Sequence, residues 1–168
     1  MANEEQLSIL KQGIEVWNVW REHNVNAKID LSDADLAHAN LSYANLRNAR
    51  LSGADLSGAN LHRVNLSAAT LKKVQFDVAN LSEADLTGAN LEDSGFWQAN
   101  LRYADLKNAR LRGVSFDETD LTGADLRGAD LRGAYLTSAK IDKAKVSRTW
   151  MYGVNVWDLE GQFDEQQD

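Results

Sequence analysis

Residues 51–71 read LSGADLSGANLHRVNLSAATL, with a leucine at every fifth position. The same register runs from Leu31 to Val156 without insertion or deletion, which gives 26 units of five residues. This large position holds 19 leucines, has Ile, Val or Met in its last four units, and includes three phenylalanines, Phe76, Phe96 and Phe116. An unbroken five-residue period over most of a chain of 168 residues indicates a repeat architecture.

The other positions of the unit are also restricted. The small position, two residues before the large one, is Ala in 18 of 26 units, and the middle position between them is Asp or Asn in 16. Eight of the 11 glycines occupy the corner position, two residues after the large one. The remaining position, directly after the large one, is called the outer position below.

A period of five matches neither a helix, which repeats at 3.6, nor a flat strand, which repeats at two. The small and large positions alternate like inward residues of a short strand, and the next two residues must then turn the chain. Glycine at the corner supports such a turn because it tolerates positive φ. The pattern predicts that each unit forms one short side and one corner, so that four units complete a four-sided coil.

The unit A(D/N)LXX, repeated over about residues 29–157, resembles the motif of the pentapeptide repeat family. That resemblance implies an all-β solenoid, a right-handed quadrilateral β-helix. About 6.5 coils rising ~4.8 Å each would make a rod roughly 31 Å long. Residues four units apart then share a column, so we expect the three phenylalanines to stack inside and Asn40, Asn60, Asn80 and Asn100 to link successive coils.

We divide the chain into an N-terminal helical cap (1–28), the repeat β-helix (29–158) and an acidic tail (159–168). Exposed coil edges require caps. Residues 4–23 predict one α-helix, with Asn3 as its N-cap, from apolar residues at helical spacing: Leu7, Leu10, Ile14, Trp17 and Trp20. Gly13 lowers helix stability by about 1 kcal/mol relative to Ala, which close packing against a tryptophan would explain. Residues 13–21 resemble a leader of bacterial, especially cyanobacterial, members of the family.

The C-terminal end allows two interpretations. Trp150, Tyr152 and Trp157 occupy outward positions of the last units, and Leu159 and Phe163 follow. The aromatic residues form a dimer interface in one interpretation, as the family resemblance implies for some members. In the other, Leu159 and Phe163 fold back over the last coil. The expected state is therefore a monomer or a C-terminal homodimer.

Composition excludes several classes of function. With no cysteine, thiolate catalysis and Cys-ligated metal sites are excluded. A net charge of −7 argues against DNA or anionic membrane binding driven by overall charge, and no apolar run is long enough for a membrane span. His23, His38 and His62 have no second ligand at metal spacing. We expect no catalytic residue, cofactor or metal, and a cytoplasmic protein that is not an enzyme.

One side of the predicted coil has a distinct charge. It consists of residues 34–38 and the corresponding segment of each later coil, up to 154–158; we call it the acidic side. It has no Lys or Arg, and its carboxylates are Asp35, Asp55, Asp77, Asp117, Glu118 and Asp158. The candidate partner-binding residues are Asp77, Trp97, Asp117, Glu118, Tyr135 and Trp157.

Two interpretations of this side remain open. In the first, Trp97 anchors an unknown protein partner and the carboxylates steer a basic surface towards it. In the second, the acidic residues keep a flat side from associating and Trp97 covers the bend at Gly95.

The family resemblance adds an alternative function, because some members bind DNA gyrase as acidic mimics of duplex DNA and confer quinolone resistance. Duplex DNA carries one charge per ~1.7 Å, hence roughly 18 over ~31 Å. Six carboxylates on one side fall well short of that density, and the loop insertions of the gyrase-protecting members are lacking here. We therefore expect a non-enzymatic structural or protein-interaction solenoid, with gyrase binding as the alternative.

Overall fold

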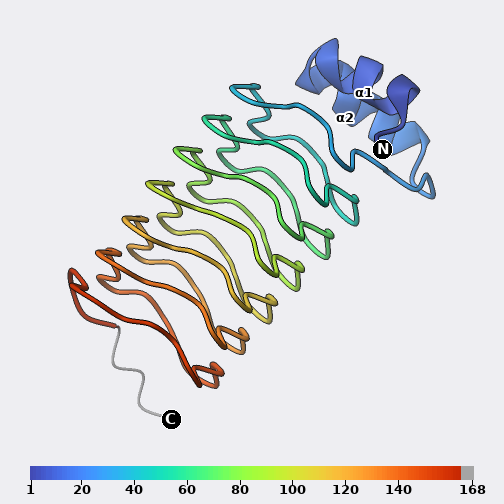
Figure 1. The fold of residues 1–168 in the computed structure, drawn as a ribbon. Helices are drawn as coiled ribbons and strands as arrows, with labels where there is room; N and C mark the ends of the chain where they lie inside the picture. Colours follow the sequence, from blue (N-terminus) through green and yellow to red (C-terminus); the bar gives the residue numbers. More distant parts are fainter. Residues whose placement is uncertain (164–168) are drawn as a thin grey trace.

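Two helices followed by a four-sided coil make up the computed structural model, which describes residues 1–163. Helix α1 comprises Glu4–Lys11 and helix α2 comprises Ile14–His23. Figure 1 shows a rod with both helices at one end and the last described coil at the other. The predicted acidic residues of 164–168 lie outside the described residues.

Successive coils pair through parallel single-residue bridges, and each bridge joins the middle positions of units four apart, as in Asn40↔Asn60. The series begins at Asp30↔Arg50 and ends at Lys140↔Glu160, so the predicted coil of four units is confirmed. From Leu31 to Ile141, each large residue donates its N–H to the next coil, as Leu46 does to Asn65 O at 2.8 Å. Each middle residue from Arg50 onwards donates back, as Asn65 does to Ala44 O at 3.0 Å. The backbone N–H and C=O groups that point along the rod axis therefore form hydrogen bonds with the neighbouring coils.

The interior consists of the small and large positions, as the pattern predicts. The phenyl rings of Phe76 and Phe96 stack with centroids 4.6 Å apart, and those of Phe96 and Phe116 are 5.2 Å apart. All three rings are fully buried. Ser94 and Thr119 replace alanine in this interior, and each hydroxyl donates a 2.6 Å hydrogen bond to a carbonyl of the preceding coil, which removes the cost of burying it.

The predicted asparagine column is confirmed. The amide of Asn60 donates to Asn40 Oδ1 at 3.2 Å, and the same bond recurs from Asn80 to Asn60 at 3.3 Å and from Asn100 to Asn80 at 3.1 Å. One side of the rod therefore carries a ladder of side-chain amides beside the backbone ladder.

The corner position has positive φ in all 26 units, whether or not it is glycine. The eight glycines have φ of 65–73° and the 18 other residues have φ of 52–64°. The turn geometry therefore imposes this conformation, and glycine is only its least strained occupant. Val78 is the most strained choice, because a β-branched residue at φ +60° is a conformational outlier.

Val78→Gly should stabilise the protein. Relief of about 1–2 kcal/mol of left-handed strain exceeds the entropy that glycine adds to the unfolded chain, for a net gain of about 0.5–1 kcal/mol. Chemical denaturation measures the free energy of unfolding. Val78→Ala is the matched control, since it keeps a Cβ at the same φ; a glycine variant no more stable than the alanine variant would contradict the prediction.

The cap consists of two helices, so the single helix predicted over residues 4–23 is wrong. Asn3 is the N-cap as predicted, and its Oδ1 accepts the Gln6 N–H at 3.0 Å. Gly13 lies between the helices with φ +120°, a conformation that residues with a Cβ rarely adopt, and this breaks the helix. A Cβ at Gly13 would meet no atom within 4 Å, so the expected close packing against tryptophan is also wrong.

Side chains of the cap extend the inter-coil ladder beyond the first coil. The first coil has no earlier coil to receive its middle N–H groups, and two amide side chains take that place. Gln6 Oε1 accepts the Asp30 N–H at 2.8 Å, and Asn18 Oδ1 accepts the Asn45 N–H at 2.9 Å. Trp17, fully buried, donates its indole N–H to Asn45 O at 2.9 Å. The helices thus cover a coil edge that would otherwise expose unpaired backbone groups.

Coil pairing at the other end runs past the predicted boundary at residue 158. Ile141 and Lys143 donate their N–H groups to Glu160 O at 2.8 Å and Gln162 O at 2.9 Å. Leu159 and Phe163 lie half-buried against the core, so this segment continues the coil rather than beginning a separate tail. Large side chains nevertheless remain exposed at this end: Trp150, Met151, Tyr152, Val156 and Trp157.

Candidate interaction surface

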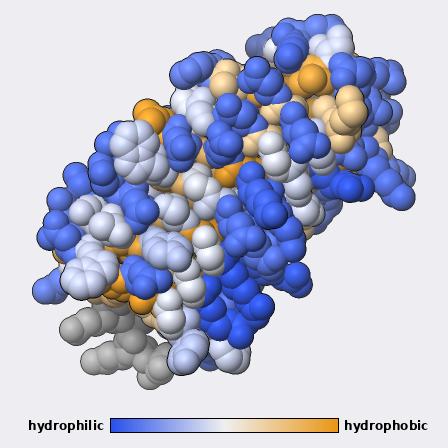
Figure 2. All heavy atoms as spheres, in the orientation of Figure 1, coloured by the Kyte–Doolittle hydropathy of each residue, from blue (hydrophilic) through white to orange (hydrophobic). Residues whose placement is uncertain are grey.

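The acidic side lies along one wall of the rod, as its register predicts. Because Phe76, Phe96 and Phe116 form one internal column, the residues after them, Asp77, Trp97 and Asp117, occupy successive coils of one external column. Trp97 is 45% exposed. Figure 2 shows one face of the rod, on which hydrophilic side chains predominate and strongly hydrophobic atoms appear only in small areas.

Most middle-position Asp and Asn side chains have a local structural task. On the acidic side, Asp35 Oδ1 accepts the Ala37 N–H at 3.2 Å, and Asp55 Oδ1 accepts the Ser57 N–H at 2.9 Å. The same turn recurs along the other sides of the rod, which explains the preference for Asp or Asn at this position. Hydrogen bonds from Ser57 are the main cause that lowers the pKa of Asp55.

Four of the seven units of the acidic side have a residue other than Asp or Asn at the middle position, and two of these four are the units of Gly95 and Tyr135. In both, an aspartate of the preceding coil supplies the acceptor. Asp77 Oδ1 accepts the Trp97 N–H at 3.2 Å, and Asp117 Oδ1 accepts the Thr137 N–H at 3.1 Å. These two candidate binding residues therefore hold coils together, a task that sequence analysis missed. An aspartate at the outer position, one coil before a unit without Asp or Asn, is the signal that these two residues share.

The surroundings of Asp117 favour its charged form. Desolvation raises the pKa of this carboxyl, but hydrogen bonds from Thr137 and from Ser115, whose Oγ lies 2.8 Å away, outweigh it, so that the pKa lies below its usual value of 3.8. A pKa that is depressed in the folded state means that the ionised carboxylate stabilises the protein above the usual pKa. This stabilisation is lost as the pH falls through the lowered pKa.

Glu118 orients the exposed indole. Its Oε1 accepts the Trp97 indole N–H at 3.3 Å, and its Oε2 accepts the Gln98 amide at 2.7 Å. Glu118 of the next coil therefore holds both the indole ring of Trp97 and the side chain of its neighbour, Gln98. Tyr135 lies one coil beyond Ser115, with which it forms a bridge, and is 47% exposed. Trp157 belongs to the terminal coil, three coils after Trp97, so the structure does not join it to the same cluster.

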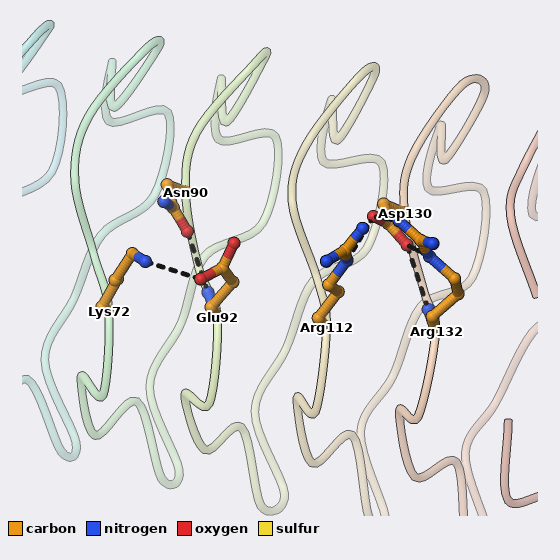
Figure 3. A network of polar contacts seen from close by, with 6 residues as sticks. All are labelled: Lys72, Asn90, Glu92, Arg112, Asp130 and Arg132. Carbon is orange, nitrogen blue, oxygen red and sulfur yellow. Dashed lines mark hydrogen bonds and ion pairs between the residues drawn. The ribbon is translucent and has the colours of Figure 1, made fainter. Parts of the chain in front are cut away.

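Charges on a neighbouring side are paired between coils, as Figure 3 shows. Lys72 Nζ lies 2.6 Å from Glu92 Oε2 of the next coil. Asp130 Oδ2 lies 2.6 Å from Arg112 Nε of the preceding coil and 2.7 Å from Arg132 Nη2 of its own coil. By contrast, none of the six carboxylates of the acidic side forms an ion pair with a cation of residues 1–163. Their charge is left for another molecule or for solvent.

Other sites for chemistry are not evident in the described part of the chain. Residues 1–163 contain no group of three His, Cys, Asp or Glu placed to hold a metal ion. His62 Nδ1 lies 2.9 Å from Ser82 Oγ of the next coil, and His23 Nδ1 lies 2.8 Å from Val19 O. No helix of this part has the length and apolar character needed to cross a membrane.

Comparison with known proteins places the repeat region in one sequence family. A model of pentapeptide repeats matches residues 29–67, and a model of a pentapeptide repeat region matches residues 69–146, which together exceed half of the chain. A comparison with curated protein sequences gives no match.

Several solved structures are similar. A trypsin-treated form of QnrB1, a plasmid-mediated fluoroquinolone resistance protein, is 18% identical over 77% of this chain and 70% of that chain, with a TM-score of 0.66. This similarity supports the fold, and the expected right-handed quadrilateral β-helix is confirmed. HetL of Nostoc sp. strain PCC 7120, involved in the regulation of heterocyst differentiation, is 25% identical over 84% of this chain and 92% of that chain (TM-score 0.33). A protein of the Arabidopsis thaliana thylakoid lumen is 32% identical over 59% of this chain and 66% of that chain (TM-score 0.40).

Asp77→Ala should lower the free energy of unfolding by about 1 kcal/mol, because the Trp97 N–H loses its acceptor. The loss should shrink to less than half in a Gly95→Asn background, where the introduced amide oxygen accepts the same N–H locally. Chemical denaturation of the four proteins measures this coupling. Asp117→Ala is the control: its carboxylate accepts the Thr137 N–H, so Gly95→Asn should not change how much this substitution lowers the free energy of unfolding. If Asp77→Ala lowers the free energy of unfolding equally in both backgrounds, Asp77 does not have the role assigned to it.

Proposed function

The chain belongs to the pentapeptide repeat family, and on that premise we propose that it is a non-enzymatic interaction solenoid that binds a protein partner with a basic surface through its acidic side. The observation that carries this proposal is the difference between sides: eight of the 12 described carboxylates on the other sides of the coil are paired with Lys or Arg, and none of the six on the acidic side is. Unpaired charges of one sign on one wall steer and orient a partner of opposite charge.

Trp97 supplies the anchor of this proposed surface. Tryptophan contributes disproportionately to protein interfaces, and here the indole is half exposed and fixed by Glu118, so little side-chain entropy remains to be lost on binding. Tyr135 extends the aromatic surface by one coil. Asp77 and Asp117 add charge, but their hydrogen bonds to the backbone make them poor targets for a test of binding.

The test is capture of proteins from a lysate of the source organism on immobilised protein. The face variant combines Trp97→Ser, Glu118→Gln and Tyr135→Ser, and leaves Asp77 and Asp117 in place. We expect the captured partner to bind at least tenfold more weakly to the face variant, because loss of an aromatic anchor costs about 2 kcal/mol or more. Raised salt should weaken capture by the unaltered protein.

The control likewise changes two exposed aromatic residues and one glutamate, on another side: Tyr43→Ser, Glu83→Gln and Tyr103→Ser. Circular dichroism and thermal unfolding verify that both variants keep the fold. Equal capture by the face variant and the unaltered protein would overturn the assignment of the surface, and so would equal losses in both variants.

Gyrase binding is less well supported than this function. Six carboxylates on one side give a charge density well below that of duplex DNA. Four of them, Asp35, Asp55, Asp77 and Asp117, also accept backbone N–H groups of the rod. The likeness to QnrB1 concerns the fold, at 18% identity. A supercoiling assay with purified gyrase should therefore show neither inhibition nor protection from quinolones; either effect would favour the alternative.

The exposed C-terminal end supports a second part of the proposal, a homodimer formed through the last coil. Apolar area at the end of a solenoid is costly to leave in water, and Trp150, Tyr152 and Trp157 are 64%, 88% and 72% exposed. A cytoplasmic location, expected from the lack of cysteine, completes the proposal.

Sedimentation equilibrium should give twice the chain mass for the unaltered protein and a monomer for the variant with Trp150→Ser and Trp157→Ser. Trp97→Ser serves as control and should remain dimeric, because it lies on the wall of the rod and not at its end. A monomeric unaltered protein at high micromolar concentration would rule out the dimer.

A further inference from the structure

A hollow of about 430 Å³ lies where the segment after α2 meets the first coils, at the opposite end of the rod from the proposed dimer interface. Its charged and amide side chains are Arg21, Asn26, Lys28, Asp30, Asn48 and Arg50. Three cations thus meet one carboxylate, although the protein as a whole carries a net charge of −7. The charge of this hollow is opposite to that of the acidic side.

Arg21 is the buried member of the group. Only 8% of it is exposed, and its Nε and Nη2 donate to Asn45 O at 3.2 Å and Arg47 O at 3.1 Å. Its Nη1 is buried and has no hydrogen-bond partner in the described part of the chain. Burial lowers the pKa of this guanidinium through desolvation, but arginine stays protonated in proteins. A buried charged donor without an acceptor is costly, and the residue that bears it lines the hollow.

The one carboxylate nearby does not neutralise the group. Asp30 Oδ1 accepts the Ser32 N–H at 3.1 Å, which holds the carboxylate in a local turn, and hydrogen bonding to Ser32 is the main cause that lowers its pKa. Its other oxygen lies 3.9 Å from Arg50 Nε, beyond hydrogen-bond distance. Lys28 forms no ion pair with any described residue. The charged residues that line the hollow, Arg21, Lys28, Arg50 and Asp30, therefore carry a net charge of +2.

We propose that this hollow between the cap and the first coil binds a small oxyanion, through Arg21 and Arg50 with the support of Lys28. Guanidinium groups are suited to this task because their N–H donors match the spacing of carboxylate or phosphate oxygens. A bound oxyanion would supply acceptors to a cation that already secures the cap to two carbonyls of the first coil. Binding should consequently stabilise the junction between α2 and the rod. This site is independent of the partner proposed for the acidic side.

Isothermal titration calorimetry with inorganic phosphate, at fixed ionic strength in chloride, tests the site. We expect saturable binding of one phosphate per chain and a rise in melting temperature with phosphate. In the variant with Lys28→Gln and Arg50→Gln, affinity should fall at least tenfold. Arg21 is left unaltered because its loss would damage the cap itself. A second titration with acetate distinguishes a site for phosphate-type anions from one that prefers carboxylates.

Two further variants make the test specific. The control with Arg63→Gln and Lys73→Gln removes the same charges from other coils and should bind phosphate as the unaltered protein does. Asp30→Asn removes the one carboxylate but keeps an oxygen for the Ser32 N–H, and should tighten binding several-fold. The proposal would be overturned if the Lys28→Gln, Arg50→Gln variant bound phosphate as tightly as the unaltered protein does. It would also be overturned if neither phosphate nor acetate showed saturable binding.

Discussion

The register of backbone hydrogen bonds between coils, in which each unit pairs with the fourth unit along the chain, is the constraint on which this structure depends. Within the rod, each large residue donates its N–H to the coil after it and each middle residue donates its N–H to the coil before it, so these groups depend on the neighbouring coils. An insertion of one residue would exchange inward and outward side chains in every later unit. That constraint accounts for the unbroken register from Leu31 to Val156.

Irregular places in the rod meet the same requirement by other means. At the first coil, the side-chain amides of Gln6 and Asn18 replace the backbone of a preceding coil. Inside the rod, Ser94 and Thr119 bond to carbonyls that lie within reach of an alanine position. On the acidic side, Asp77 and Asp117 replace the local acceptor that Gly95 and Tyr135 cannot provide. At the first coil and on the acidic side, the polar side chain is explained by a backbone N–H that would otherwise lack an acceptor; in the interior, a backbone carbonyl instead satisfies the buried hydroxyl.

The requirement that every backbone group has a partner distinguishes charged side chains that hold the rod together from charged side chains that are available for binding. Carboxylates bound to backbone N–H groups or to arginines on neighbouring coils are part of the rod, as at Asp117 and Asp130. Glu118 instead holds an exposed indole, and Arg21 has a donor with no acceptor among the described residues. The groups most informative about binding are therefore those whose hydrogen bonds do not complete the coil, at the acidic side and at the junction of the cap.

The sequence by itself determined the four-sided coil, its interior and the column of phenylalanines, because a fixed period leaves one way to place small and large residues inside. It also located the acidic side, since side and column follow from residue number alone. It did not determine the division of the cap at Gly13, where the backbone conformation departs from the helical pattern. Only the tertiary structure decided which carboxylates are committed to the fold and where a cation lacks a partner, because both depend on contacts between residues of different coils or of the cap and a coil.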